Sequence, residues 1–248
     1  LSSFKTNLEV LQVPPTFWPQ NPTLENYVKI INDPKLPLLR FYGNSTFVAV
    51  VVTLTGVALA STTGYAFSRY SFVGKKVGML SLLVTQMFPA TMLLLPMYLL
   101  LQKLDLLNSL MGLMIVYVTT ALPFCVWTMK GYYDSIPRDL EEAALIDGLT
   151  PMGAFVRIVL PLSLPALTIT ALFSFMAAWS EFIVARVVLS NQNLFTLPLG
   201  LEALAGTFQT EWANYAAGSV LVSIPVVVLF LVLNRFLVSG LTLGGVKG

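Results

Sequence analysis

The sequence has no histidine and only one cysteine among its 248 residues. Without histidine, the chain lacks the most common general base of enzymes and the most common metal-ligating side chain. The single cysteine, Cys125, excludes an intrachain disulfide and any zinc site built from several cysteines. We therefore expect this chain to be no enzyme and to bind no metal.

A phosphate-binding loop is missing as well. No G-x-x-x-x-G-K-[ST] motif occurs, and the nearest approach, Gly74-Lys75-Lys76, lacks the upstream glycine and the following hydroxyl residue. Charged residues make up only 10% of the chain, against about 25% in soluble domains, and no basic tract is present for nucleic acid. Hydrophobic residues, in contrast, reach 56%, so a lipid bilayer is the expected surrounding.

Five apolar stretches are long enough to cross a membrane, which takes roughly 20 residues of helix. They cover residues 44–67, 77–101, 109–129, 163–185 and 216–238. Since an irregular backbone cannot face lipid, we expect all five to be helices. Kinks are expected at the prolines inside them, which are Pro89, Pro96, Pro123, Pro165 and Pro225. The chain is thus predicted to be an all-α integral membrane protein.

Positive charge predicts the orientation of these spans. The connections after the first and third spans, and the tail after residue 234, hold most of the Lys and Arg residues, whereas the other two connections hold only Lys103 and Arg186. Basic connections stay on the cytoplasmic side of a membrane. We therefore expect residue 1 outside and residue 248 in the cytoplasm.

Residues 1–43 form a proline-rich segment that the orientation places outside the membrane. The segment is not a signal peptide, because it has neither a basic start nor an apolar centre. We expect a further helix ahead of Leu1 to have moved it across the membrane; export without such a helix is the alternative. The predicted division is 1–43 extracytoplasmic, 44–238 transmembrane domain and 239–248 cytoplasmic tail.

The long polar connection at residues 131–162 has the pattern of two short helices. Ser135 is placed to cap the first helix, and Gly148 can end it in a left-handed conformation. Thr150-Pro151 then fits the cap and first residue of the second helix. A polar stretch of this length in so apolar a chain indicates a surface with a function.

One stripe of the first helix in this connection is small and flat. It is formed by Leu140, Ala143, Ala144 and Asp147. An amphipathic helix on lipid headgroups is one interpretation, but such helices are usually basic and this segment is acidic. Docking of a partner protein is therefore favoured. The neighbours Glu141 and Glu142 point about 100° apart on a helix, so they do not form an acid/base pair.

The connection resembles the EAA signature of binding-protein-dependent ABC importer permeases. The matching residues are Glu142-Ala143-Ala144, Gly148, Ile158 and Leu160-Pro161, at the family's spacing. Other segments resemble the carbohydrate-uptake branch of that family, and the last of them the maltose-type permeases. These segments are Phe67–Lys75, Gln86–Pro89, Trp127–Tyr132 and the end of the chain from Asn234. The resemblance covers nearly the whole chain. The family's first helix has no counterpart among residues 1–248, which agrees with the helix expected ahead of Leu1.

This resemblance implies the transmembrane domain fold of a type I ABC importer and three functional segments. The coupling helix, which docks on a cytoplasmic ATPase, would contain Glu141, Glu142, Ala143, Ala144, Asp147 and Gly148. The tail that reaches the ATPase would be Gly244, Gly245, Val246, Lys247 and Gly248. The loop that enters the binding protein would be Ala205, Gly206, Thr207, Phe208, Gln209 and Thr210. Residues that contact the transported solute are not identified.

The implied function is that of one permease subunit of an ATP-driven sugar importer, for a maltose- or trehalose-like sugar, in the inner membrane. Its expected partners are a homologous second permease subunit, two copies of an ABC ATPase that binds ATP and Mg, and an extracytoplasmic sugar-binding protein. One alternative is an ABC permease for another solute, such as glycerol phosphate. A second is an ion-coupled carrier, for which Glu181 is the one intramembrane charge; that side chain could equally point towards water.

Overall fold

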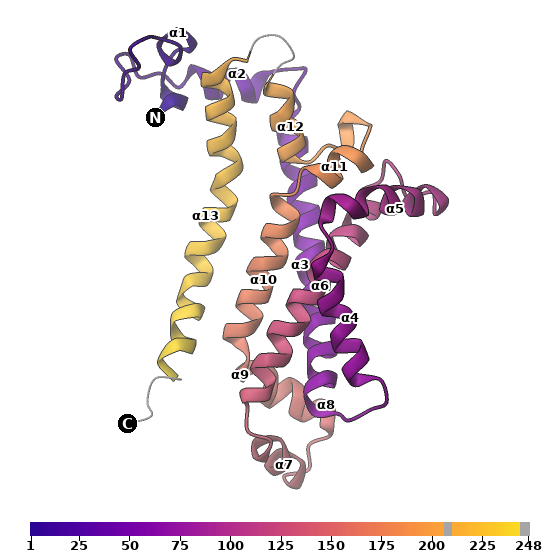
Figure 1. Ribbon diagram of the computed structural model, residues 1–248. Helices are drawn as coiled ribbons and strands as arrows, with labels where there is room; N and C mark the ends of the chain where they lie inside the picture. The colour runs from indigo at the N-terminus through magenta and orange to yellow at the C-terminus, as the bar shows by residue number, and fades with distance from the viewer. Residues whose placement is uncertain (206–209, 244–248) are drawn as a thin grey trace.

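A computed structural model of the protein describes residues 1–205 and 210–243, and within these ranges all regular structure is helical (Figure 1). The elements are, in chain order, η1 Ser2–Phe4, α1 Asn7–Val10, α2 Glu25–Asn32, α3 Leu38–Arg69, α4 Lys75–Met87, α5 Ala90–Lys103, α6 Leu110–Ser135, α7 Asp139–Ile146, α8 Pro151–Ala154, η2 Phe155–Val159, α9 Leu160–Leu162, α10 Leu164–Trp179, α11 Ile183–Val188, η3 Gln192–Leu194, α12 Leu197–Leu204 and α13 Trp212–Leu243. The η1 and η3 segments are 3₁₀ turns, whereas η2 is a π-helix.

Three single helices are long and apolar enough to cross a membrane, and two bent helix pairs are further candidates. The single helices are α3, α6 and the Trp212–Asn234 part of α13. The bent pairs are α4 with α5, at 105°, and Pro151–Leu162 with α10, at 78°. If each bent pair is one span, the described residues hold the five spans predicted from the sequence. The first span begins earlier than predicted, at Leu38, because the apolar helix continues through residues 38–43.

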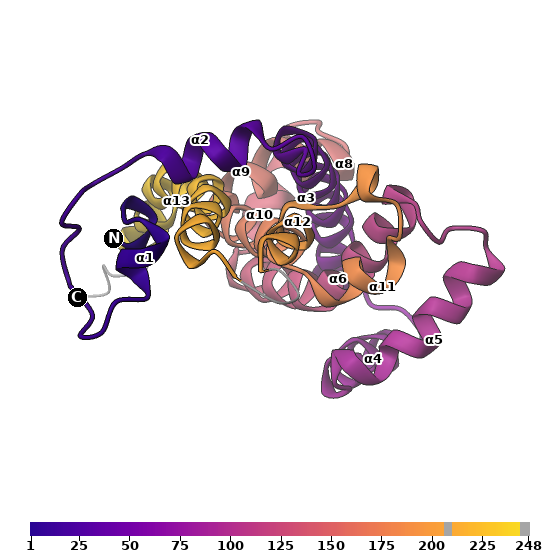
Figure 2. The ribbon, with the colours of Figure 1, turned by 90° about the horizontal axis from the view of Figure 1, so that it is seen from above.

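The second predicted span is not one kinked helix. The structure ends α4 at Met87 and restarts at Ala90, and Phe88 between them has an extended backbone (ψ 129°). Pro89 explains the break, since proline lacks an N–H and disfavours the helical conformation of the residue before it. In Figure 2, α4 and α5 extend away from the other helices. Pro96, in contrast, lies inside α5.

The fourth predicted span is also shorter than expected, because α10 ends at Trp179. The chain turns at 180–182 and forms the short helix α11. Glu181 lies in this turn, where its carboxylate accepts hydrogen bonds from the Val184 and Ala185 backbone N–H groups (2.8 and 3.1 Å) and from the Tyr117 hydroxyl (2.7 Å). The carboxylate therefore holds the start of α11 against α6 and does not simply extend into water.

Helices α3, α6 and α10 form the centre of the molecule. At Gly64, α3 approaches α6 so closely that a Cβ atom would lie 2.9 Å from the Met129 Cβ. Buried Cys125 on α6 lies 3.3 Å from the Ser174 hydroxyl on α10. The indole N–H of Trp179 donates to the backbone of α13. The first two contacts join α6 to α3 and to α10, and the third joins α10 to α13.

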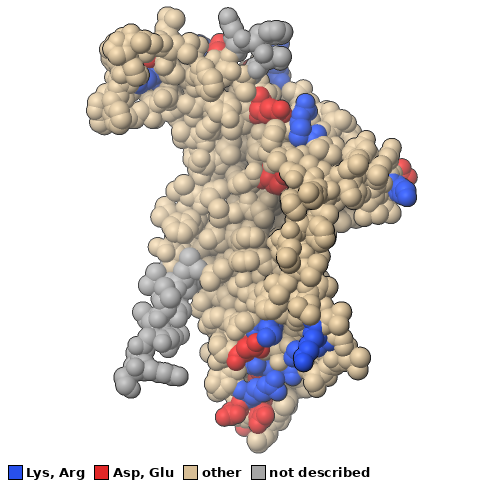
Figure 3. Space-filling model, in the orientation of Figure 1, with Lys and Arg blue, Asp and Glu red and all other residues tan. Residues whose placement is uncertain are grey.

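The molecule has two polar ends, which we name the α7 end and the α2 end after the helices found there (Figure 1). In Figure 3, red and blue atoms gather at these ends and at the tip of a projecting arm, and the belt between the ends is almost entirely tan. A buried apolar cluster lies towards each end. The larger one includes Phe41, Trp179 and Leu197, and the smaller one includes Tyr133 and Phe155. The chain thus has the charge distribution of a membrane-spanning protein.

Candidate docking site at the α7 end

Helix α7 starts later than the sequence predicts. Ser135 is the last residue of α6, and its hydroxyl donates to the Tyr132 carbonyl (2.6 Å), so it does not cap α7. The residue that precedes α7 is Arg138, which makes no side-chain cap bond. The prediction was wrong because α6 continues past the expected end of its apolar stretch, so that Ser135 belongs to α6 and lies four residues before α7.

The end of α7 and the start of α8 agree with the sequence. Gly148 has a left-handed backbone (φ +89°), which favours glycine. Its N–H bonds to Leu145 O (3.1 Å), and the next N–H, of Leu149, bonds to Ala144 O (3.0 Å). This pair of bonds is a Schellman C-cap. Thr150 then accepts the N–H of Gly153 (3.1 Å), which confirms it as the cap of α8.

The two faces of α7 differ in their surroundings. Glu141 and Ala144 are buried against the rest of the chain. The exposed residues include both polar and apolar side chains: Leu140, Glu142, Ala143, Leu145, Ile146, Asp147 and Gly148. The predicted stripe is therefore divided, because Ala144 lies on the inner face while its three other members are exposed. Ile146 is 86% exposed and follows the exposed Leu145, so α7 presents apolar side chains at the polar α7 end.

A buried ion pair fixes the inner face of α7 to α3. The Arg69 Nε atom lies 2.5 Å from Glu141 Oε1, and the two side chains are only 8% and 11% exposed. The Tyr65 hydroxyl donates to the other carboxylate oxygen of Glu141 (2.6 Å), and an Arg69 Nη atom donates to the carbonyl of Ile136 (3.0 Å). We call Tyr65, Arg69 and Glu141 the α3–α7 joint.

More polar contacts surround the joint. Ser68 donates to Asp134 Oδ1 (2.7 Å), whose other oxygen lies 2.5 Å from the Lys130 ammonium. Arg138 donates to the Ser68 carbonyl (3.2 Å). The end of α3, the end of α6 and the start of α7 are therefore connected by charge-assisted bonds, which are stronger than neutral ones.

Sequence reasoning did not identify the joint. The sequence places Arg69 among the positive charges of the connection after the first span and Glu141 in the expected coupling helix, without linking the two residues. The available signal was weak: an arginine directly at the end of an apolar span and a doubled acid in the polar connection. Nothing in the sequence pairs residues that are 72 positions apart.

The exposed surface of α7 is better suited to binding another protein than to catalysis or metal binding. Among the described residues, no group of three or more Cys, Asp or Glu side chains is arranged to hold a metal ion. The surface combines two carboxylates with exposed Leu140, Leu145 and Ile146, which is the composition of an interface with a basic, partly apolar partner.

The other two predicted segments lie mostly outside the described residues. Of the segment 205–210, Ala205 follows the end of α12, and the Thr210 hydroxyl donates to the Ala205 carbonyl. Residues 206–209 and the whole tail 244–248 are not described. The two ends of the first segment are thus held together at the α2 end of the molecule.

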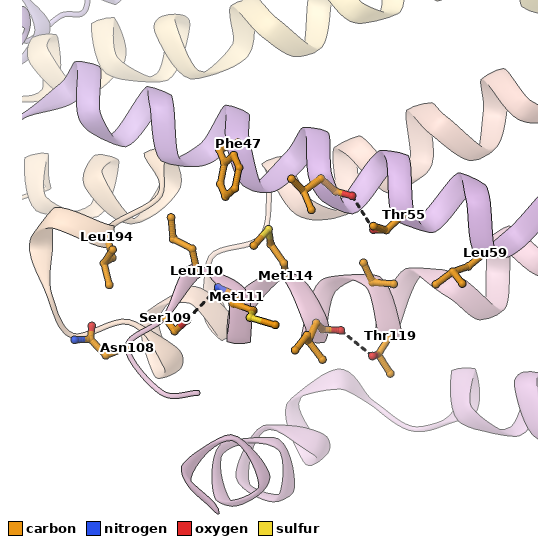
Figure 4. A pocket seen from close by; sticks show the side chains of 13 residues that line it. Phe47, Thr55, Leu59, Asn108, Ser109, Leu110, Met111, Met114, Thr119 and Leu194 are labelled. Atoms are coloured by element: carbon orange, nitrogen blue, oxygen red, sulfur yellow. Dashed lines mark hydrogen bonds between the residues drawn. The ribbon is translucent and has the colours of Figure 1, made fainter. Parts of the chain in front are cut away.

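An open groove of about 880 Å³ runs between α3 and α6 (Figure 4). Most of its lining is apolar, including Phe47, Met111 and Met114. The hydroxyls of Thr55 and Thr119, which also line it, donate to carbonyls of their own helices (both 2.7 Å). A sugar in this groove would meet mainly hydrocarbon, so the groove suits lipid or another apolar helix better than a polar solute.

Comparison with known proteins gives the class of the chain. Residues 52–242 match the family model described as binding-protein-dependent transport system inner membrane component. The chain belongs to this family, which makes it a multi-pass inner-membrane permease subunit of the ABC importer class, and it has the type I permease fold expected from the sequence.

Individual relatives agree with this class. The chain is 38% identical to the inner membrane ABC transporter permease protein YcjP of Escherichia coli (strain K12), over 100% of this chain and 89% of the relative. It is 37% identical to the trehalose/maltose transport system permease protein MalG of Thermococcus litoralis, over 91% of this chain and 82% of the relative. A crystal structure of a bacterial ABC transporter involved in the import of the acidic polysaccharide alginate has the same fold, with a TM-score of 0.80 at 23% identity, over 94% of this chain and 86% of that one.

Proposed function

We propose that this chain is one of two permease subunits of an ATP-driven sugar importer, and that its α7 is the helix that docks on the ATPase. The observation that carries this proposal is the outer face of α7. It presents Glu142, Asp147 and an 86% exposed Ile146, on a helix whose end is fixed by the cap at Gly148. Within this chain nothing covers that face in the described residues. A separate ATPase with a basic, partly apolar cleft would cover it.

The rest of the assembly follows from this docking. The α7 end then lies in the cytoplasm, as does the C-terminus, and the α2 end faces an extracytoplasmic sugar-binding protein. In this proposed assembly, residues 205–210 would contact that binding protein and residues 244–248 would contact the ATPase. A homologous second permease completes the path, and two ATPase copies bind ATP and Mg, so this chain itself binds no cofactor.

The proposed solute is a di- or oligosaccharide of the maltose or trehalose kind. The names of several relatives support it, including the trehalose/maltose permease of Thermococcus litoralis. A relative of similar identity, 36%, is the sulfoquinovosyl glycerol transport system permease protein SmoH of Agrobacterium fabrum, which favours a glycoside of glycerol as a second candidate. Titration of the purified binding protein with maltose, trehalose, glycerol phosphate and a glyceryl glycoside distinguishes these solutes.

Reconstitution tests the function directly. Vesicles that contain this chain, its sister permease and the ATPase are expected to take up labelled sugar only when binding protein and ATP are both present. Glu142→Lys combined with Gly148→Leu reverses a docking charge and strains the cap, so uptake and ATPase co-purification should fall about tenfold or more. Lys103→Glu, a charge reversal of equal size at the exposed end of α5, is the control and should keep both.

Uptake driven by an ion gradient without ATP hydrolysis would contradict the proposal. It would support an ion-coupled carrier, for which Glu181 is the obvious residue. The three hydrogen bonds that the Glu181 carboxylate already accepts argue against that role.

A further inference from the structure

The α3–α7 joint differs from the other ion pairs in the part of the chain that the structure describes. Both of its side chains are nearly buried, at 8% and 11% exposure. The pairs Lys29–Glu25, Lys130–Asp134 and Arg186–Glu202 have side chains that are 25% to 63% exposed. An exposed pair contributes little, whereas separating a buried one leaves an uncompensated charge. Of these four ion pairs, the one in the α3–α7 joint is therefore the hardest to separate.

The joint connects α7 to α3, a helix that runs from the α7 end to the α2 end of the molecule (Figure 1). Helix α3 has 32 residues, which corresponds to about 48 Å. Near its far end, the hydroxyl of buried Ser45 accepts the backbone N–H of Leu197, the first residue of α12 (2.7 Å). A displacement of α7 that carries the end of α3 with it thus reaches α12 and the segment that follows.

The covalent path from α7 towards the same end is more compliant. It runs through the short helix α8, the π-helical segment Phe155–Val159 and a 78° bend before α10. π-Helical turns are rare and energetically poor, and bends are places where helices yield. Three routes therefore leave α7: a polar one through the α3–α7 joint, a short covalent one back through residues 136–138 into α6, and the interrupted covalent one forward through α8 and η2.

We propose that Tyr65, Arg69 and Glu141 are positioning residues that transmit the movement of a docked α7 to α3, and so set how much solute is moved for each ATP hydrolysed. This inference rests on the proposed function, because it assumes that α7 docks on an ATPase. None of the three side chains contacts solute or nucleotide in this role. They act by keeping α7 and the end of α3 in one rigid unit throughout the cycle.

The deciding measurement is the ratio of solute taken up to ATP hydrolysed by the reconstituted complex. Partial unfolding or poor assembly lowers uptake and hydrolysis together and leaves this ratio unchanged. Failure of transmission lowers uptake while binding-protein-stimulated hydrolysis continues. The ratio therefore separates a positioning role from a purely structural one.

The principal variant is Arg69→Met combined with Glu141→Leu. Replacing both members of a buried ion pair by apolar residues is often neutral for stability, whereas it removes the directional bonds of the joint. The expected ratio is about two- to thirtyfold below that of the unmodified complex. The matched control is Lys29→Met with Glu25→Leu, the same exchange in an exposed pair on α2, and its ratio should not change.

A second variant, Tyr65→Phe, decides the matter if the first does not assemble. It retains the ring contact with Phe155 (centroids 4.4 Å apart) and removes only the hydroxyl that donates to Glu141. Its ratio should fall about twofold or more. If either assembled variant shows the unmodified ratio, the inference is overturned. If the unmodified complex shows no ATP-driven uptake, the proposed function fails instead, and the two failures are distinguishable.

Discussion

The two ends of the molecule are held together by different chemistry. At the α7 end, charged side chains from α3, α6 and α7 bond to one another, and the Arg69–Glu141 pair is buried. At the α2 end, the ion pairs Lys29–Glu25 and Arg186–Glu202 are exposed, and neutral side chains bond to backbone groups. Asn44 donates to the carbonyls of Asn193 and Phe195 (2.9 and 3.0 Å), and Asn108 accepts the N–H groups of the turn before η3.

This difference separates a rigid end from an adaptable one. A buried charge pair is costly to separate, because each charge loses its only compensation. An amide that bonds to the backbone of a loop can exchange that bond for water or another carbonyl at little net cost. We therefore expect the α7 end to move as one unit and the α2 end to rearrange as solute passes.

The largest expected effect is the loss of one charge from the buried pair. Arg69→Ala leaves the Glu141 carboxylate buried without its partner, and we expect a loss of about 3–5 kcal/mol in the free energy of unfolding. Arg186→Ala breaks the exposed pair with Glu202 at the other end, where a change of about 0–1 kcal/mol is expected. Unfolding of the detergent-solubilised protein, followed by circular dichroism, measures both. Equal effects would remove the distinction between the ends.

An intermediate effect is expected from a neutral bond at the α2 end. Ser45→Ala leaves the buried N–H of Leu197 without its acceptor, which should cost about 1–3 kcal/mol. Ser223→Ala is the control, because the Ser223 hydroxyl only donates to the Ser219 carbonyl of its own helix (2.8 Å). The same unfolding measurement applies. A loss larger than that of Arg69→Ala would show that the neutral end is the more firmly held.

The smallest effect should come from the cap of α7. Gly148→Ala places a Cβ on a left-handed backbone and is expected to cost about 1–2 kcal/mol, although no atom lies within 4 Å of that position. Gly131→Ala, inside α6 and equally open, should instead stabilise by roughly 0.5–1 kcal/mol, because alanine favours helix. Thermal unfolding measures both variants. Changes of opposite sign in the free energy of unfolding would show that the left-handed backbone, and not a lack of space, requires glycine at position 148. Equal shifts would refute it.

Local structure at the α7 end was largely predictable from the sequence. The left-handed glycine at 148 and the cap and first residue at Thr150-Pro151 depend on neighbouring residues only, so short-range rules suffice for them. The start of α7 depends on where α6 stops, and the apolar stretch alone places that end too early. The local signal for it is Pro137, because Ile136 directly before this proline has an extended backbone (ψ 122°).

The roles of the two adjacent acids show what the sequence cannot provide. Helical geometry predicts that Glu141 and Glu142 point in different directions, but not which one faces inward. The position of Arg69 decides this, and that position is known only once α3 and α7 are placed together. The 105° bend at Pro89 is similar: proline predicts a distortion, whereas the direction and size of the bend are set by tertiary contacts.

The lone thiol of Cys125 makes the protein ready for labelling without prior removal of native cysteines. It is fully buried beside Ser174, and a thiol sequestered in this way reacts slowly with maleimides. A cysteine introduced at either end would thus carry the only fluorophore or spin probe under native conditions. On denaturation the native thiol becomes reactive, so a maleimide dye then reports the opening of the α6–α10 contact itself.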